Sequence, residues 1–337
     1  MKKQHTKWAL FLVLLLILTG FAIVLSLITG EVSISLKDFF QAMESKTGLP
    51  YAVITKIRWP RIILAFAVGG SLSLTGAILQ GIYRNPLVEP YTLGISGGAA
   101  LGIALVIVLG LHLSLGSLML PIAGFTGSAL TIFLVYFLSM RRGNIHIGRM
   151  LLIGVMISFV ASSAMMFLMS ITTSDNLHNI IFWTMGSLEE PNSLLIKIVF
   201  WSAISGLVIS YFFARPLNAL RLGAEKARHL GIHSTVTIRV LFIVASLLTG
   251  ICVAVAGIIG FVGLIIPHII RLIIGSDYRI LLISSFLGGS LFLMISDLIA
   301  RTIISPNELP IGVITGIIGG LVFIGVLART NLKNKLS

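Results

Sequence analysis

Charged residues are scarce in this sequence. Of its 337 residues only 10% are Asp, Glu, Lys or Arg, whereas 57% are hydrophobic and the mean hydropathy is +1.07. A soluble domain needs far more polar surface, so the composition predicts an all-α integral membrane protein. Acidic residues are the scarcer of the two charged classes, with 11 Asp and Glu against 24 Lys and Arg. The net charge of +13 is spread over the ends of apolar runs, which argues against a nucleic-acid partner.

Cysteine is nearly absent as well. The single one, Cys252, lies in an apolar run, so the chain offers neither a disulfide nor a cysteine metal site. The seven histidines are scattered without carboxylates at ligand spacing, and we therefore expect no metal site. The motifs G-x-x-x-x-G-K-[ST], H-E-x-x-H and G-x-S-x-G are missing. We expect no catalytic residues, no nucleotide bound by this chain and no enzymatic activity.

Apolar runs near or above the ~20 residues that cross a bilayer recur along the chain. The first is too long for the hydrophobic region of a signal peptide and lacks a small-residue cleavage site, so we interpret it as a retained span. Between Val240 and Ile274 the chain is almost continuously apolar, and we divide it where glycines at 257, 260 and 263 weaken a helix. The predicted spans are 8–28, 61–82, 92–111, 119–139, 148–170, 194–213, 237–256, 258–275, 279–303 and 311–328.

The distribution of charge predicts the orientation of these spans. With both termini on the cytoplasmic side, 17 of the 24 Lys and Arg residues lie at inner ends and seven at outer ends. Acids show the reverse bias, with seven of the eleven outside. Because an excess of Lys and Arg is typical of cytoplasmic loops, we predict about ten transmembrane helices with both termini cytoplasmic.

Glycines seven residues apart occur in the second span, at Gly69 and Gly76, and in the seventh, at Gly250 and Gly257. In lipid, close backbone approach at small residues does much of the helix packing. These two spans lie five apart and run in opposite directions. The pattern indicates an inverted repeat of spans 2–5 and 7–10, as transporters use.

Two arginines at the outer end of the second span, Arg58 and Arg61 in the segment RWPR, run against the charge bias. They either dock an acidic surface of a partner or contact membrane lipid headgroups. Asp297 and Arg301 lie four residues apart within the ninth span, share a helix face and can pair. A structural ion pair is one interpretation, and a proton- or ion-coupling site is the other.

Two further segments are irregular where simple anchors would be helical. The stretch from Gln80 to Ala99, QGIYRNPLVEPYTLGISGGA, predicts a hinge between the second and third spans, because it holds two prolines, an Arg–Glu pair and a glycine cluster. The stretch from Gly260 to Arg279 carries Pro267 on a short span. Irregular backbone at membrane depth survives only where protein buries it or where it lines a watery path. Both segments are therefore predicted to face protein or such a path.

The most polar segment is Arg215 to Ile232, RPLNALRLGAEKARHLGI. It carries four cations against one acid, Glu225, and two Leu-Gly steps that punctuate short helices. It is either a topology anchor of the positive-inside kind or a surface that contacts a cytoplasmic partner.

Six motifs, in order between residues 58 and 320, resemble a known family. They are RWPR, GAILQGIYRNPLVEPYTLGISGGA, WTMGSL, LNALRLGAEKARHLGI, GFVGLIIPHIIRLIIGSDYR and DLIARTI followed by ELPIGVITGIIGG. The chain is similar to the permease subunit of the ferric-siderophore and vitamin B12 type of binding-protein-dependent ABC importers. The resemblance implies one permease domain over residues 1–337 in a bacterial cell membrane. It also implies a second permease, identical or paralogous, a cytoplasmic ABC ATPase that binds ATP and magnesium, and an extracytoplasmic binding protein.

The resemblance also implies roles for particular residues. Coupling to the ATPase, through the loop 215–236, would involve Leu217, Leu220, Leu222, Gly223, Glu225, Ala227, Leu230 and Gly231. Docking of the binding protein would involve Arg58, Arg61 and Arg301. The hinge and path would involve Asn85, Pro86, Pro90, Gly94, Gly97, Gly98 and Pro267. The segment that forms an inner gate in relatives, 144–148 here, lacks small hydroxyl residues, so we assign no gate residue.

An iron-siderophore complex is the cargo that the resemblance favours, with haem or cobalamin as alternatives. A rival function of another class is an ion-coupled secondary transporter. That function requires titratable groups in the middle of the membrane, and Asp297 is the one candidate in the sequence.

Overall fold

The computed structural model describes residues 2–30, 34–116, 118–141, 144–145, 147–304 and 307–335. In chain order its elements are α1 (Lys2–Ile28), α2 (Leu36–Ser45), α3 (Gly48–Ala52), the π-helical turn η1 (Val53–Arg58), α4 (Trp59–Tyr83), the 3-10 turn η2 (Pro90–Leu93), α5 (Ile95–Val108), α6 (Leu111–Leu115), α7 (Met119–Ser139), β1 (Met140–Arg141), β2 (Asn144–Ile145), α8 (Ile147–Ile171), α9 (Ser174–Met185), α10 (Ser193–Phe212), α11 (Ala214–Leu220), α12 (Ala224–His229), α13 (Ser234–Ala256), α14 (Val262–Ile274), α15 (Tyr278–Thr302) and α16 (Ile311–Lys335).

The helices confirm the predicted all-α membrane fold. In the described part of the chain, seven helices are long and apolar enough to cross a membrane. The other three predicted spans are shorter apolar helices: α5, α14 and the stretch Ile311–Val326 of α16. The predicted bounds of the third and eighth spans were too wide, because each helix begins only after an irregular segment.

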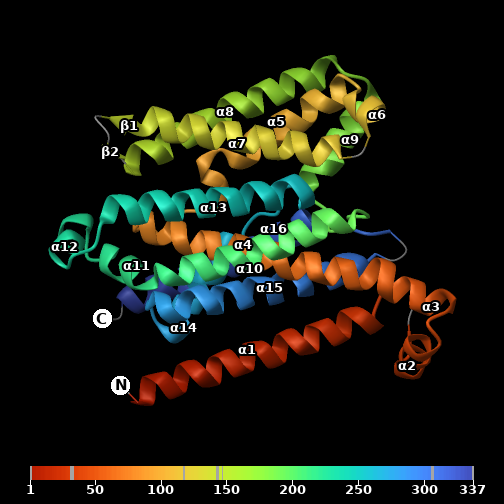
Figure 1. Cartoon of the computed structure of the whole chain (residues 1–337), viewed down its shortest axis with the longest axis horizontal. Coiled ribbons are helices and arrows are strands. Elements are labelled where there is room, and N and C mark those ends of the chain that lie inside the picture. Colours follow the sequence, from red (N-terminus) through yellow and green to blue (C-terminus); the bar gives the residue numbers. More distant parts are fainter. Residues whose placement is uncertain are drawn as a thin grey trace.

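Both described ends of the chain lie at one end of the bundle, beside α12 and the β1–β2 hairpin, whereas α2, α3 and α6 lie at the other (Figure 1). The predicted common side for the two termini is therefore confirmed. The hairpin pairs Met140 with Ile145 and precedes α8. The segment 144–148 discussed above includes His146, which lies outside the described residues.

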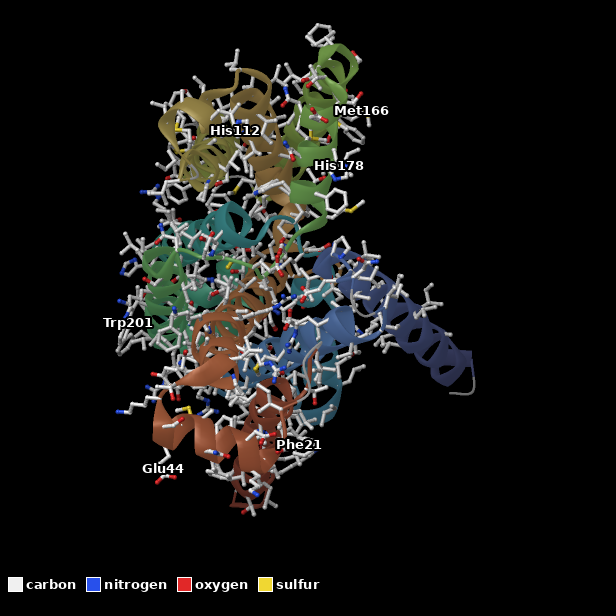
Figure 2. The ribbon with its side chains drawn as sticks, turned by 90° about the vertical axis from the view of Figure 1, so that its right-hand side faces the viewer. Phe21, Glu44, His112, Met166, His178 and Trp201 are labelled. Atoms are coloured by element: carbon white, nitrogen blue, oxygen red, sulfur yellow. The ribbon has the colours of Figure 1, made fainter. Side chains whose placement is uncertain are left out.

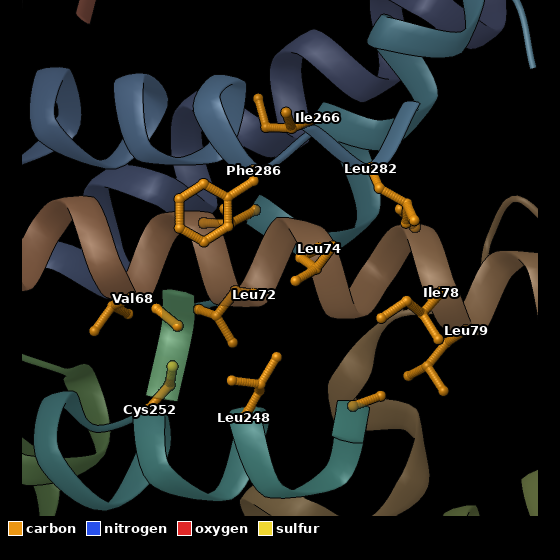
Figure 3. Packing of buried hydrophobic residues seen from close by; sticks show 14 of the residues in the cluster. Val68, Leu72, Leu74, Ile78, Leu79, Leu248, Cys252, Ile266, Leu282 and Phe286 are labelled. Carbon is orange, nitrogen blue, oxygen red and sulfur yellow. The ribbon is translucent and has the colours of Figure 1, made fainter. Parts of the chain in front are cut away.

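Helix α4 forms the centre of the bundle. It packs against α15, α10, α13 and α14, and its side chains from Leu64 to Ile82 are buried with few exceptions. Figure 3 shows α4 with Phe286 and Leu282 on one side and Leu248 and Cys252 of α13 on the other. Glycine allows this density, because a Cβ on Gly69 would collide with backbone atoms of α15.

The packing follows the predicted inverted repeat. In the first half, the short helix α5 packs against α7 and α8. In the second half, the short helix α14 packs against α15 and α16 in the same relation. The glycines that indicated the repeat have matching surroundings, since Gly69 of α4 packs on α15 and Gly250 of α13 packs on Ser128 of α7.

Candidate functional site

The two short helices begin near the middle of the bundle. Gly94 precedes α5 with φ 83°, and Phe261 precedes α14 with φ 69°, so both are left-handed. A Cβ on Gly94 would lie 3.0 Å from Thr131 Cγ2, at the middle of α7, and one on Gly263 would lie 2.7 Å from Leu72 O, at the middle of α4. Helices that start at mid-depth, on the two halves of a repeat, are typical of transporters.

Polar side chains hold these two helix starts together. Glu89 Oε1 accepts a hydrogen bond from Phe261 N at 2.6 Å. The Tyr91 hydroxyl donates to Ile259 O and accepts from Ile259 N, both at 3.1 Å, as a hydroxyl can do. Irregular backbone in an apolar setting is costly unless such groups are satisfied, so Glu89 and Tyr91 stabilise the break.

Gln80 of α4 compensates for the proline in α14. Pro267 has no N–H, so the carbonyl of Gly263 four residues earlier has no helical donor. Gln80 Nε2 lies 3.2 Å from both Gly263 O and Leu264 O, and Gln80 Oε1 accepts from Arg271 Nη2 at 3.0 Å.

The predicted hinge residues thus fall into two groups. Pro90, Gly94 and Gly98 lie at the break, where Pro90 packs against Gly263 and Gly98 against α7, and Gly97 faces α8. The remaining residues lie apart from the break. Asn85 and Pro86 lie in the inner turn after α4, where Asn85 Oδ1 accepts a hydrogen bond from Leu87 N. Pro267 lies within α14. Sequence reasoning named Glu89 only as a member of an Arg–Glu pair and did not single out Gln80 or Tyr91. For Gln80, a polar side chain at the end of an apolar span is the signal that could have found it.

Charged side chains cluster at the outer end of the bundle around Arg61. Its Nε lies 2.7 Å from Asp297 Oδ1, and its Nη1 lies 2.6 Å from Glu308 Oε2 and 3.2 Å from Glu189 Oε1. Arg301 pairs with Asp297 at 3.1 Å, which confirms the predicted pair within one helix. These five residues are called the outer cluster below.

The arginines of this region are buried. Arg58, Arg61 and Arg301 are 3 to 6% exposed, and Arg58 Nη1 donates to Leu27 O at 2.5 Å. The role of these arginines in docking a binding protein stays a prediction. The more exposed members of the outer cluster are the carboxylates of Glu189 and Glu308, with 65% and 36% of their side-chain surface exposed. Partial burial and the neighbouring Glu308 raise the pKa of Glu189, and Arg61 opposes that shift.

A pocket of about 550 Å³ adjoins the outer cluster. Its walls come from α5, α9, the segment 186–189 and the segment 308–311, and Arg61, Glu189 and Glu308 line it. A backbone hydrogen bond joins the two segments, since Ile311 N donates to Gly186 O at 3.3 Å. The outer cluster therefore ties both segments to α4 and α15.

At the inner end, the predicted coupling loop folds into α11 and α12. Leu217, Leu220 and Ala227 are buried and anchor the loop to the bundle, whereas Leu222 and Leu230 are about 60% exposed. Glu225 is exposed in the first turn of α12. Gly223 and Gly231, with φ 108° and 77°, flank α12 in conformations that favour glycine.

A polar contact missed by sequence reasoning fixes α11 to the start of α15. Asn218 Nδ2 donates to Asp277 Oδ1 at 2.9 Å, and Asn218 Oδ1 accepts from Tyr278 N at 3.0 Å. Asp277 caps α15 and pairs with Arg279. Hydrogen bonds from Arg279 lower the pKa of Asp277 to about 2, and partial burial opposes this shift.

Comparison with known proteins identifies the family. The model of the FecCD transport family matches residues 14–329. This chain belongs to the FecCD transport family. It is 35% identical over 321 residues to the hemin transport system permease protein HmuU of Yersinia pestis, a match that covers 95% of this chain and 94% of HmuU. It is also 35% identical over 335 residues to the vitamin B12 import system permease protein BtuC of Shigella boydii, covering 97% of each.

A solved structure agrees with this assignment. An inward-facing structure assigned to the metal-chelate type of ABC transporter superimposes with a TM-score of 0.82 and 31% identity, covering 96% of this chain and 99% of that one. The FecCD member described here is accordingly a multi-pass permease subunit of an ABC importer.

Proposed function

We propose that this permease moves a bulky metal chelate into the cytoplasm, powered by a separate ATPase and supplied by an extracytoplasmic binding protein. The observation that carries the proposal is that the inner loop has one face buried against the bundle and one face exposed. Leu217, Leu220 and Ala227 fasten it to the bundle, while Leu222, Glu225 and Leu230 face outward. Such a loop suits the transmission of movement from a cytoplasmic partner, and that partner would bind ATP and magnesium.

Helix α15 supports this proposal because it connects the two ends of the molecule. Its first turn is bonded to α11 through Asn218 and Asp277. Its last turns carry Asp297 and Arg301 of the outer cluster. Twenty-five helical residues reach about 37 Å, so a shift of the coupling loop would be carried as a rigid-body movement to the outer end.

For the cargo, we propose a metal complex of a planar macrocycle, hemin or cobalamin, before an iron-siderophore. The named relatives support this order, since one is a hemin permease and another a vitamin B12 permease. The iron-siderophore preference of the sequence analysis gains no comparable support. The rival ion-coupled transporter is disfavoured by the position of Asp297, which is engaged by two arginines at the outer end.

The test is uptake in a deletion strain offered labelled hemin, cobalamin and ferric siderophores separately. Restoration of one uptake by the gene names the cargo, and co-purification of an ATPase with the permease supports the partner. Glu225→Arg should abolish the restored uptake without lowering membrane abundance. Glu44→Arg is the matched control, because Glu44 lies on α2, at the end of the bundle opposite α12 (Figure 1), and its exposed side chain projects from the surface (Figure 2). Normal uptake with Glu225→Arg would contradict the coupling role.

A further inference from the structure

An apolar groove opens on the side of the bundle between α1, α4 and α10. It encloses about 430 Å³. Trp59, Ile63 and Phe66 of α4 form its floor, and Ile23 of α1 and Phe200 of α10 form its walls. The Phe66 and Phe200 rings lie 6.5 Å apart and bound its deep end. The groove faces sideways, into the hydrocarbon of a membrane.

The groove exists because α1 is held away from α10. Polar contacts fix α1 at both of its ends. Lys7 Nζ donates to Ile273 O at 2.9 Å at the inner end, and Arg58 donates to Leu27 O at the outer end. Between these points α1 packs mainly on α15 and lies along the edge of the bundle (Figure 1). Helix α1 therefore leaves one face of the outer end of α4, which carries Trp59, Ile63 and Phe66, partly exposed.

One lysine lines this groove, and a second lies on the turn that leads into α4. Lys197 lines the groove from the second turn of α10. Lys56, on η1, lies three residues before Trp59. Both are exposed, and neither forms an ion pair within the described part of the chain. Cations on the outer side run against the positive-inside bias, and an anionic partner lowers the cost of a charge at the membrane surface.

We propose that this groove binds an anionic phospholipid of the outer leaflet. One acyl chain would lie along Ile63 and Phe66, and the phosphate would lie between Lys56 and Lys197, with the Trp59 indole at headgroup level. From Trp59 to Phe66 the helix rises about 10 Å, roughly two-thirds of the ~15 Å hydrocarbon depth of one leaflet. Basic sites between transmembrane helices recognise anionic headgroups in this way.

Two native tryptophans can serve as fluorescence probes of this site, one inside the groove and one as a control outside it. Trp59 lines the groove, whereas Trp201, 66% exposed, projects from the periphery of α10 (Figure 2). Two full-length proteins that each retain one of these tryptophans, with the other three replaced by Phe, are reconstituted in phosphatidylcholine vesicles. A tenth of the lipid is then exchanged for phosphatidylglycerol or phosphatidylcholine with brominated chains, which quench tryptophan in contact.

The expected result is that brominated phosphatidylglycerol quenches Trp59 well beyond its mole fraction, while Trp201 follows the mole fraction for both lipids. Each lysine contributes about fivefold to anionic lipid affinity, so Lys56→Gln with Lys197→Gln lowers the preference about 25-fold. Arginine at both positions retains it. Lys37→Gln, at an exposed outer lysine on α2, leaves it unchanged.

A further variant separates the groove from simple surface attraction. Ile63→Phe fills the groove and keeps both lysines, so it should remove the excess quenching of Trp59. Excess quenching that survives Ile63→Phe would mean that the lysines only enrich anionic lipid at the surface, and the groove site would be wrong. Equal quenching of Trp59 and Trp201 by phosphatidylglycerol would overturn the proposal as well.

Discussion

The two ends of this permease use charge in opposite ways. At the outer end, Arg61 and Arg301 are 6% exposed and matched by Asp297, Glu189 and Glu308 within the same chain. At the inner end, the charges of α12 are exposed and its buried contacts are apolar. A buried pair that loses one member leaves an uncompensated charge, whereas an exposed charge costs little to replace. The outer cluster therefore contributes to stability, whereas the exposed charges of the inner loop remain available for the proposed contact with a cytoplasmic partner.

The strongest test of this contrast is Asp297→Asn. Asp297 is 1% exposed and is the carboxylate shared by Arg61 and Arg301. Its neutralisation leaves two buried guanidinium groups with too little negative charge, which should cost about 3–5 kcal/mol of stability. We expect a large fall in thermal stability in detergent and in membrane abundance, with uptake falling in parallel.

The same variant separates importer from ion-coupled transporter. A proton- or ion-coupling carboxylate would lose transport on Asp297→Asn while the protein stayed abundant and stable. That outcome would contradict the structural role of the outer cluster. Asp175→Asn, at an exposed acid of the same end, serves as control and should change neither quantity.

Between the two ends, Gln80→Leu tests the break at mid-depth. This substitution removes the donor to Gly263 O and leaves a buried carbonyl without its partner, which should cost about 1–3 kcal/mol. Pro267→Ala returns a backbone N–H to α14 and satisfies that carbonyl within the helix. Gln80→Leu should therefore cost less in the Pro267→Ala background than alone, as measured by a double-mutant cycle of unfolding free energies. Equal costs in both backgrounds would show that Gln80 acts elsewhere.

The sequence predicted those features that depend on local pattern. Hydropathy identified the spans, and four-residue spacing identified the Asp297–Arg301 pair. Contacts between distant residues carried no such signal: Glu189 and Glu308 reach Arg61 across 128 and 247 residues. The predicted starts of the third and eighth spans, residues 92 and 258, both precede the helices, which begin at Ile95 and Val262. The left-handed residue before α14 is Phe261, a residue type that gives no indication of positive φ, whereas the one before α5 is Gly94, a residue type typical of such positions.

The smallest expected effect concerns Asp277, a partly exposed carboxylate at the inner end. Its pKa is lowered from 3.8 to about 2, so its ionised form stabilises the folded state above pH 3.8 and loses that contribution as the pH falls through about 2. Solvent screening keeps the contribution under about 1 kcal/mol. The difference in melting temperature between the wild-type protein and Asp277→Asn should be constant from pH 7 to pH 5 and shrink below pH 4. A difference that grows on acidification would mean that Asp277 is held in its protonated form, and its role as an ionised cap of α15 would be wrong.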